Sequence, residues 1–192
     1  MINKPYHHGD LRNSLIEAGI ELINQEGIKN LSLRKVAALC GASHAAPYSH
    51  FKNKEELLKA MQDHVTEQLM EALENTIQSY TKSNDSNLLI KVGKSYVMFF
   101  IHNPQYFPFL QPCMKVNLSM VDDGTKNFPP FELFKTIALP GLRELKIPEE
   151  KRKDAIISMW ATVHGLASIA TMKNVYYDED WEKKIEDIIW NK

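Results

Sequence analysis

The sequence predicts an all-α protein in which a small N-terminal domain is joined by one long helix to a larger helical domain. Apolar residues recur at intervals of three and four along most of the 192 residues, which is the period of an amphipathic helix. No stretch of useful length alternates between apolar and polar residues, as a half-buried strand does. Capping residues, glycines and prolines stand at the ends of the periodic runs. A chain of this length can bury a core of its own.

Three short helices are predicted in the first 50 residues. Asp10 is a plausible N-cap of the first helix, and Gly27 ends it. Ser32 caps the second helix, and Gly41 supplies the left-handed backbone that is favoured just beyond a helix end. Residues 43–49 form the third, whose proline lies near enough to the start to be tolerated. The expected inner faces are Leu11, Leu15, Ala18, Leu22 and Ile23 in the first helix, and Val36, Ala37, Leu39 and Cys40 in the second.

The longest helix is predicted to begin at Asn53, where Glu56 follows at the spacing of a capping box. Its apolar face continues to Tyr80, so the helix is about 40 Å long at roughly 1.5 Å per residue. Such a helix could join two domains rigidly. The polar residues 81–87 predict a loop after it. The residues at helical spacing are Leu58, Met61, Val65, Leu69, Ala72, Leu73, Thr76 and Ile77.

The second half predicts further helices separated by connections that contain proline. The first of them ends before Pro104, and prolines interrupt residues 105–130, which predicts short helices and a mobile loop. The next is periodic, although Pro140 should kink or split it. Pro148 starts a long helix and Asp180 caps the last one. The first predicted helix runs from residue 88 to just before Pro104, and the others span residues 131–145, 149–173 and 180–190.

The composition bounds the class of protein. There are 23 Lys/Arg against 24 Asp/Glu, and the formal net charge of −1 argues against a general polyanion binder. Within residues 1–60, eight Lys/Arg stand against six Asp/Glu, which is a weak basic tilt. Cys40 and Cys113 lack metal-ligand spacing, and Cys40 is expected as a small core residue; no metal and no cofactor are predicted. Without a long apolar run or a signal core, we expect a soluble, cytoplasmic protein.

The segment from Gly27 to Leu58 carries the strongest motif in the chain. Ala37 and Gly41 keep the four-residue spacing of a helix-turn-helix, with a small residue where helices touch and a glycine at the turn. The ordered elements are Leu31-Ser32-x-Arg34-x-Val36-Ala37, then Gly41-Ala42-Ser43, then Tyr48-x-His50-Phe51, then Lys54-Glu55-x-Leu57. In this order they resemble the TetR family of bacterial transcriptional regulators.

A helix-turn-helix protein inserts the first residues of its recognition helix into the major groove, so residues 43–46 should lie nearest the base edges. There a histidine can donate or accept a hydrogen bond, and alanine methyl groups can contact thymine. The resemblance further implies residues that contact or flank phosphates. The predicted DNA-binding residues are Ser32, Arg34, Ser43, His44, Ala45, Ala46, Tyr48, His50 and Lys54, and Lys4, His7, His8 and Arg12 are placed to reach adjacent backbone.

Several of these residues also have a purely structural interpretation. Phe51 is expected in the core, whereas Tyr48 is open to both a core role and a phosphate role. Ser32 is an N-cap in either case, and Lys54 could simply be a solvated lysine in the first turn of its helix. The two adjacent histidines of the N-terminal arm lack the i, i+4 geometry of a metal site.

The C-terminal half carries a second resemblance. The run Trp160-Ala-Thr-Val-His164-Gly165, together with the start Tyr6-His7-His8-Gly9-Asp10, resembles the TetR subgroup with a Trp/His-Gly signature. This resemblance implies that the helices at 149–173 and 180–190 form a four-helix interface in a homodimer. Two recognition helices would then lie about one DNA turn apart on a palindrome. The small residues that would allow close approach are Ala161, Gly165, Ala167 and Ser168.

The resemblance also implies an effector cavity inside each subunit. Aromatic and methionine side chains favour an apolar or aromatic ligand. His164 is either a polar handle for that ligand or a buried histidine bonded to a backbone carbonyl, and each of the other residues could be ordinary core. The candidate wall residues are Phe99, Phe100, Phe107, Phe109, Met114, Met159, Trp160 and His164.

The sequence therefore predicts a DNA-binding domain at 1–53 and an effector-binding and dimerisation domain at 54–192. The predicted function is a ligand-responsive transcriptional regulator, with a repressor preferred over an activator. The predicted partners are operator DNA, a second copy of the chain and a small molecule, and no membrane is predicted as a partner. The alternatives are a DNA-binding dimer without a ligand and a small all-α enzyme. The enzyme lacks support, because the chain has no Ser/His/Asp order and no glycine-rich phosphate loop, and Asp122-Asp123 is more simply a turn.

Overall fold

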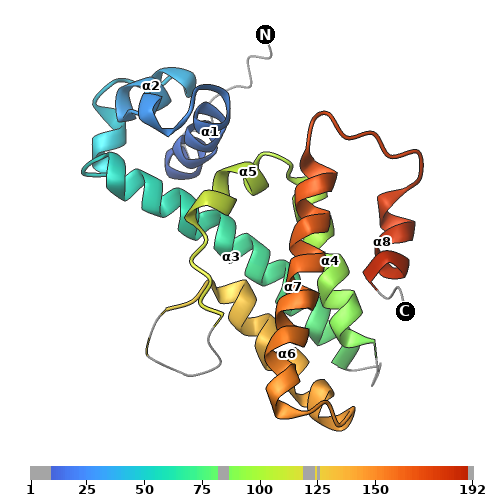
Figure 1. Cartoon of the computed structure of the whole chain (residues 1–192). Coiled ribbons are helices and arrows are strands. Elements are labelled where there is room, and N and C mark those ends of the chain that lie inside the picture. Colours follow the sequence, from blue (N-terminus) through green and yellow to red (C-terminus); the bar gives the residue numbers. More distant parts are fainter. Residues whose placement is uncertain (1–9, 82–86, 119–123, 125, 190–192) are drawn as a thin grey trace. The chain divides into compact units, whose positions relative to one another are not determined.

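The structure, a computed structural model, describes residues 10–81, 87–118, 124 and 126–189, and every regular element within these residues is a helix (Figure 1). The chain divides into two compact units. Residues 1–65 and 108–113 form the N-terminal unit, and residues 66–107 and 114–192 form the C-terminal unit. Helix α3, Lys54–Thr81, belongs in part to each. The N-terminal arm with Lys4, His7 and His8, most of the predicted loop at 81–87, and Asp122-Asp123 lie outside the described residues.

The N-terminal unit begins with two capped helices, as the sequence predicts. Helix α1 spans Leu11–Glu26, and the carboxylate of Asp10 accepts a hydrogen bond from the Asn13 N–H at 3.3 Å. The short 3₁₀ helix η1, Ile28–Asn30, leads to α2, Leu33–Leu39, whose N-cap Ser32 accepts from the Lys35 N–H at 3.2 Å. Gly27 and Gly41 have φ of 83° and 66°, which suits glycine at both helix ends.

Two expectations about this unit are wrong. The third helix is shorter than the predicted 43–49, because it is the 3₁₀ helix η2, Ala46–Ser49. Pro47 has no N–H to donate, and the neighbouring N–H groups of Ala46 and Tyr48 reach back three residues. Leu39 is 61% exposed, because it lies about 200° round the helix from Ala37, which is fully buried.

Helix α3 begins as the sequence predicts. The Asn53 side chain accepts from the Glu56 N–H at 2.8 Å, and the Glu56 carboxylate accepts from the Lys52 N–H at 2.6 Å. These bonds satisfy donors at a helix start that has no intrahelical partners for them. The first three turns then bury the apolar residues Leu57, Met61 and Val65 in the N-terminal unit.

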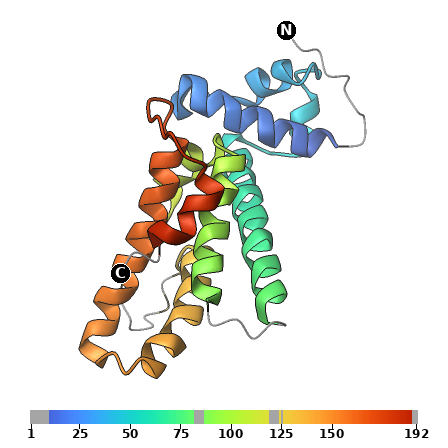
Figure 2. The same cartoon turned by 90° about the vertical axis from the view of Figure 1, so that its right-hand side faces the viewer.

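In the C-terminal unit, α4 is the central helix and lies against three others (Figure 2). Helix α4 spans Leu88–His102 and contacts α6, Pro129–Glu144, α7, Glu149–Thr171, and α8, Trp181–Ile189. Between α4 and α6 the chain forms α5, Tyr106–Leu110, and the 3₁₀ helix η3, Gln111–Cys113, and the boundary between the units falls after Phe107. The short helices predicted within 105–130 are thus confirmed.

Pro140 does not split α6, contrary to one of the two outcomes that the sequence allows. Two other prolines occupy the first turn of α6, where a missing N–H costs no helix bond. Ala138 and Leu142 are both buried on either side of Pro140, so the helix keeps its packed face across the one lost hydrogen bond.

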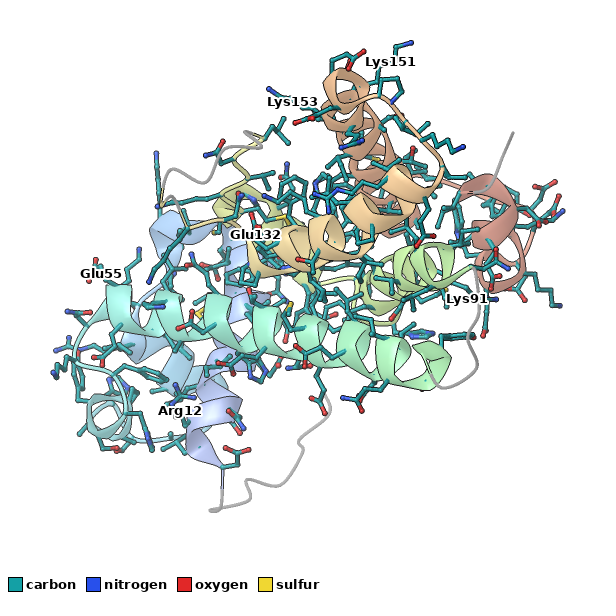
Figure 3. All side chains as sticks on the ribbon, turned by 90° about the horizontal axis from the view of Figure 1, so that it is seen from below. Arg12, Glu55, Lys91, Glu132, Lys151 and Lys153 are labelled. Carbon is teal, nitrogen blue, oxygen red and sulfur yellow. The ribbon has the colours of Figure 1, made fainter. Side chains whose placement is uncertain are left out.

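Helix α8 is fastened to α4 by apolar and ionic contacts. Ile185 is fully buried, and the Glu186 carboxylate lies 2.6 Å from the Lys91 ammonium and 3.0 Å from that of Lys94. Figure 3 shows Lys91 on α4. Its hydrogen bond, followed by that of Lys94, lowers the pKa of Glu186 below the ordinary value for a glutamate. A Cβ on Gly93 would lie 3.1 Å from Val163, so glycine lets α7 approach α4 closely.

Among the residues described, the structure contains no helix that is both long and apolar enough to cross a membrane.

Candidate functional site

All nine residues predicted to bind DNA lie at the surface of the N-terminal unit. Ser32, Ala46 and Lys54 are half-buried. The other six are exposed, and they are Arg34, Ser43, His44, Ala45, Tyr48 and His50. The structure therefore leaves every side chain of the predicted interface accessible to solvent.

The turn after α2 presents residues 43–46. The Ala42 N–H donates to the Ala37 carbonyl at 2.9 Å, and the Gly41 N–H donates to the Ala38 carbonyl at 3.1 Å, which closes the end of α2. The chain then reverses, and the Ala46 N–H donates to the Ser43 carbonyl at 3.0 Å. Pro47 is buried beneath this segment, so the polar and methyl groups of residues 43–46 face outward.

The ring of Phe51 packs in the core beneath the same segment. Its ring is 2% exposed, as the core interpretation predicts, whereas Tyr48 is 52% exposed. The guanidinium of Arg12, an exposed residue near the start of α1 (Figure 3), lies 5.6 Å from the centroid of the Phe51 ring. This cation–π contact gives Arg12 a defined place beside the residues that follow η2.

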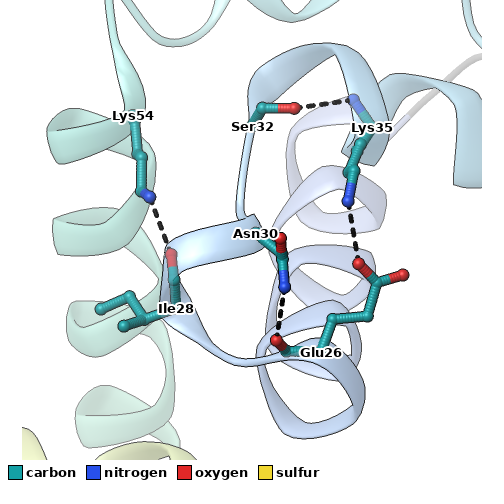
Figure 4. A network of polar contacts seen from close by, with 6 residues as sticks. All are labelled: Glu26, Ile28, Asn30, Ser32, Lys35 and Lys54. Carbon is teal, nitrogen blue, oxygen red and sulfur yellow. Dashed lines mark hydrogen bonds and ion pairs between the residues drawn. The ribbon is translucent and has the colours of Figure 1, made fainter.

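A network of polar contacts joins the end of α1 to α2 and α3 (Figure 4). The Asn30 side chain donates to the Glu26 carbonyl at 2.7 Å, and the Glu26 carboxylate lies 2.8 Å from the Lys35 ammonium. The Lys54 ammonium donates to the Ile28 carbonyl at 2.7 Å. The sequence does not predict these contacts. The partner of Lys54 is the backbone carbonyl of Ile28, 26 residues earlier in the chain, and no residue type marks such a partner.

The C-terminal unit contains a cluster of packed aromatic rings. Trp160 is at its centre, with ring centroids 5.2 Å from Tyr96, 5.1 Å from Phe131 and 6.0 Å from the stacked ring of His164. Phe107 lies 5.1 Å from His164 and extends the cluster toward Phe100. Helices α4, α5, α6 and α7 thus all contribute rings to one site.

One hydrogen bond crosses this cluster, between the Tyr96 hydroxyl and Nδ1 of His164, 3.0 Å apart. Burial raises the pKa of the Tyr96 phenol and lowers the pKa of the His164 imidazole, so both groups are neutral at pH 7. A buried hydroxyl that fails to donate is costly, which assigns the donor role to Tyr96 and the acceptor role to Nδ1. The imidazole proton then lies on Nε2, which is left as a hydrogen-bond donor.

The eight predicted effector-site residues are only partly brought together. Five of them share the ring contacts of the aromatic cluster: Phe99, Phe100, Phe107, Trp160 and His164. Met114 and Met159 are half-buried, and Phe109 is buried in the N-terminal unit. Sequence reasoning missed Tyr96, Phe128, Phe131 and Phe134, although Tyr96 precedes Phe100 by four residues on one helix and could have been found from that spacing.

The outer face of α7 carries the small residues predicted for a dimer interface, with one exception. Ala161 is exposed, and a Cβ on Gly165 would meet nothing within 4 Å. Ala167 is fully buried inside the unit instead, because it lies on the opposite face of the helix, beside Val163 and Leu166. Ile169 and Met172 continue the outer face and are 44% and 53% exposed.

The described residues hold no group of three or more His, Cys, Asp or Glu side chains arranged for a metal ion. The Cys40 thiol is half-buried and lies 3.3 Å from the Ser14 carbonyl, and burial raises its pKa above the ordinary value for a cysteine. Neither observation gives Cys40 the acidic, accessible thiol of a reactive cysteine.

The sequence of the N-terminal unit is similar to those of known proteins. Residues 15–61 match the family described as "Bacterial regulatory proteins, tetR family". Over 68 residues the chain is 35% identical to the HTH-type nicotine-responsive transcriptional repressor HdnoR of Paenarthrobacter nicotinovorans, a match that spans 35% of each chain. Over 50 residues it is 44% identical to the tetracycline repressor protein class D of Escherichia coli, a match that spans 26% of this chain and 23% of that repressor.

Solved structures resemble the whole chain in fold. A bacterial regulatory protein in the tetR family from Rhodococcus RHA1 has a TM-score of 0.67 at 16% identity, covering 94% of this chain and 96% of that chain. The TetR family transcriptional regulator PfmR from Thermus thermophilus has a TM-score of 0.64 at 17% identity, covering 91% and 96%. At these identities the likeness concerns the fold alone, and the sequence match to the curated relatives spans about a third of their length or less.

Proposed function

Because the chain belongs to the TetR family of bacterial regulatory proteins through its DNA-binding domain at residues 15–61, we propose that it is a transcriptional repressor. In this proposal a homodimer binds a palindromic operator, and binding of a small-molecule effector releases the dimer from the operator. Residues 1–53 bind DNA, and residues 54–192 bind the effector and the second copy. The observation that carries the proposal is the segment 43–46, exposed at residues 43–45 and half-buried at Ala46, which follows the glycine turn of the matched domain.

Two groups of residues divide the work on DNA. Ser43, His44, Ala45 and Ala46 read base edges in the major groove, where the imidazole can bond to a base and the methyl groups can contact thymine. The second group contacts or flanks phosphates, which fixes the register of the protein on the duplex. Its members are Ser32, Arg34, Tyr48, His50 and Lys54.

A second copy of the chain would cover the outer face of α7. Ser158, Ala161, Gly165, Ile169 and Met172 recur there at intervals of three and four, so they form one continuous stripe. The stripe combines small residues with two exposed apolar side chains. Such a surface supports close packing of an identical helix across a two-fold axis. Helix α8 would complete the four-helix interface.

The effector is proposed to be an apolar, aromatic molecule with a hydrogen-bond acceptor. The aromatic cluster supplies the apolar surroundings, and the Nε2 proton of His164 supplies a donor. The pKa of His164 is lowered by burial, so the imidazole offers a neutral donor and no positive charge. The name of the nicotine-responsive relative supports a small-molecule response of this general kind.

The DNA-binding proposal is tested with a duplex recovered by in vitro selection. Tyr48→Ala should weaken binding about tenfold on every sequence, the effect of losing about one hydrogen bond to a charged group. His44→Ala should instead relax preference at one base pair, worth about 1–3 kcal/mol. Lys59→Met is the control, because Lys59 is paired with Asp63 on an exposed part of α3. Unchanged affinity in a folded Tyr48→Ala protein would refute the assigned interface.

The same duplex tests release by an effector. Small molecules recovered from the purified protein by mass spectrometry are added back, and the dissociation constant is measured again. A weaker complex is expected, because the effector favours a conformation that fits the operator poorly. If the duplex binds tightly and none of the recovered compounds alters its affinity, the DNA-binding dimer without a ligand is the better description.

A further inference from the structure

Lys54 occupies a helix position that disfavours a cation. It is the first residue of α3, where unpaired N–H groups make the helix end electropositive. Glu55 and Glu56 in the same turn suit that field, whereas a lysine does not. The Lys54 ammonium instead turns to the Ile28 carbonyl, at an Nζ–O distance of 2.7 Å (Figure 4).

The connection between α1 and α2, residues 27–31, accepts the hydrogen bond from Lys54 and lies at the electronegative C-terminal end of α1. No residue in the last turn of α1 is basic, so the helix has no cation of its own at that end. Lys35 from α2 pairs with Glu26, and Asn30 donates to the Glu26 carbonyl. Lys54 adds a third tie from α3, to a carbonyl that also accepts from the Leu31 N–H at 3.3 Å.

Helix α1 is held against α3 at two further places. A Cβ on Gly19 would lie 3.0 Å from the buried sulfur of Met61, so the two helices are closely packed there. The Glu17 carboxylate lies 2.8 Å from Nε2 of His64. The tie made by Lys54 reaches the connection that leads directly into α2.

We propose that Lys54 is a positioning residue. Its ammonium holds the connection 27–31 against α3 and thereby fixes the start of α2, where Ser32 and Arg34 meet the DNA. Removing the ammonium loosens this connection, and the loss of DNA affinity comes from the misplaced α2 start more than from a lost charge. The DNA part of the inference rests on the proposed function, whereas the structural part does not.

Hydrogen exchange of the full chain without DNA tests the structural part. In Lys54→Met, the amides of Asn30 and Leu31, which donate to the Gly27 and Ile28 carbonyls, should exchange about tenfold faster. Lys54→Arg should keep wild-type protection, because a guanidinium can donate to the same carbonyl. Lys52→Met, at an exposed lysine two residues earlier, is the matched control and should also keep it. Equal exchange in Lys54→Met and the wild type would overturn the proposal.

The salt dependence of DNA binding tests the functional part, with the duplex selected by the wild-type protein. A lysine that only neutralises a phosphate contributes about 0.9 to the slope of log K against log salt concentration. We expect Lys54→Met to bind about tenfold more weakly with an unchanged slope. Asn30→Ala loosens the same connection without removing a charge, and it should reproduce this behaviour.

A lower slope in Lys54→Met, with normal binding by Asn30→Ala, would overturn the proposal and make Lys54 a simple phosphate contact. If the wild-type protein selects no duplex at all, the proposed function fails, and hydrogen exchange still decides whether Lys54 holds the connection.

Discussion

At the scale of single residues, the Tyr96–His164 pair gives the aromatic cluster a fixed polar direction. The phenol donates to Nδ1, so the ring of His164 cannot turn without breaking a buried hydrogen bond. Trp160 stacks on the same imidazole from one helical turn earlier and restricts it further. The Nε2 donor is therefore held in one orientation without a ligand, which would reduce the entropy lost on binding of the proposed effector.

The lowered pKa of His164 predicts a pH dependence of stability. The unfolded chain, with an ordinary pKa of 6.5 at this residue, takes up the proton first as the pH falls. The stabilisation linked to neutral His164 is thus present above about pH 6.5 and is lost below it. As the pH falls below about 6.5, urea unfolding should show a steeper loss of unfolding free energy in the wild type than in His164→Gln. His50→Gln, at an exposed histidine, should follow the wild type, and equal slopes in all three would contradict the prediction.

Residue-level inference from sequence succeeded where spacing decides burial and failed where a partner is distant along the chain. Phe51 is expected in the core, and its ring is 2% exposed. The apolar character of Leu39 predicts a buried side chain, but its position on a seven-residue helix turns it outward. The bond between Tyr96 and His164 joins residues 68 positions apart, and no local pattern reports it.

At the scale of elements, α8 illustrates how a short helix depends on packing. It has nine residues, and helices of this length are marginal in water unless a neighbour buries one face. Ile185 supplies that face and is fully buried, and Glu186 adds two ion pairs with α4. The sequence could predict the helix from Asp180 and the apolar spacing, but not its partner, because several helices offer comparable apolar faces.

Removing the Ile185 side chain should loosen α8 selectively. Ile185→Ala is expected to cost about 2–5 kcal/mol, because it empties a buried site. Ile188→Ala on the same helix is the control, since Ile188 is 36% exposed and should cost about 0.5 kcal/mol or less. Urea unfolding gives the free energies, and hydrogen exchange should show early opening of α8 in Ile185→Ala. Similar costs for the two variants would contradict the burial of Ile185.

Sequence signals predict helix starts better than helix type. Asp10, Ser32 and Asn53 each cap a helix through a side-chain hydrogen bond, as their positions predict. The segment 43–49 has the composition of a helix, yet Pro47 and the three-residue hydrogen bonds around it produce a 3₁₀ turn. Such a choice depends on how Pro47 is buried, which the sequence alone does not specify.

At the scale of the whole molecule, the proposed dimer depends on the outer face of α7. Gly165→Arg should yield a monomer in sedimentation, because the added side chain would enter the interface while meeting nothing within 4 Å of its Cβ inside the subunit. Glu74→Arg, at an exposed position of α3, should leave the dimer intact. A dimer that persists in Gly165→Arg would place the interface elsewhere. The monomer should also lose most operator affinity, because it presents half of the phosphate contacts.

The all-α fold and its long connecting helix follow from the sequence, because helical periodicity is continuous and strand-like alternation is missing from it. The predicted domain boundary at residue 53 falls where the long helix is predicted to begin. Side-chain packing continues further, since Leu57, Met61 and Val65 belong to the core of the N-terminal unit. That extension could not be predicted, because the same apolar stripe runs unbroken along α3 into the C-terminal unit.

The N-terminal unit is discontinuous along the chain, because residues 108–113 belong to it together with residues 1–65. Phe109 and Leu110 in that segment are almost fully buried. A chimera that grafts residues 1–65 onto another regulator would therefore inherit an incomplete core. If residues 43–46 read the bases as proposed, transplanting these four residues alone is the better way to exchange DNA specificity, because it leaves both segments of the N-terminal unit, 1–65 and 108–113, with their native neighbours.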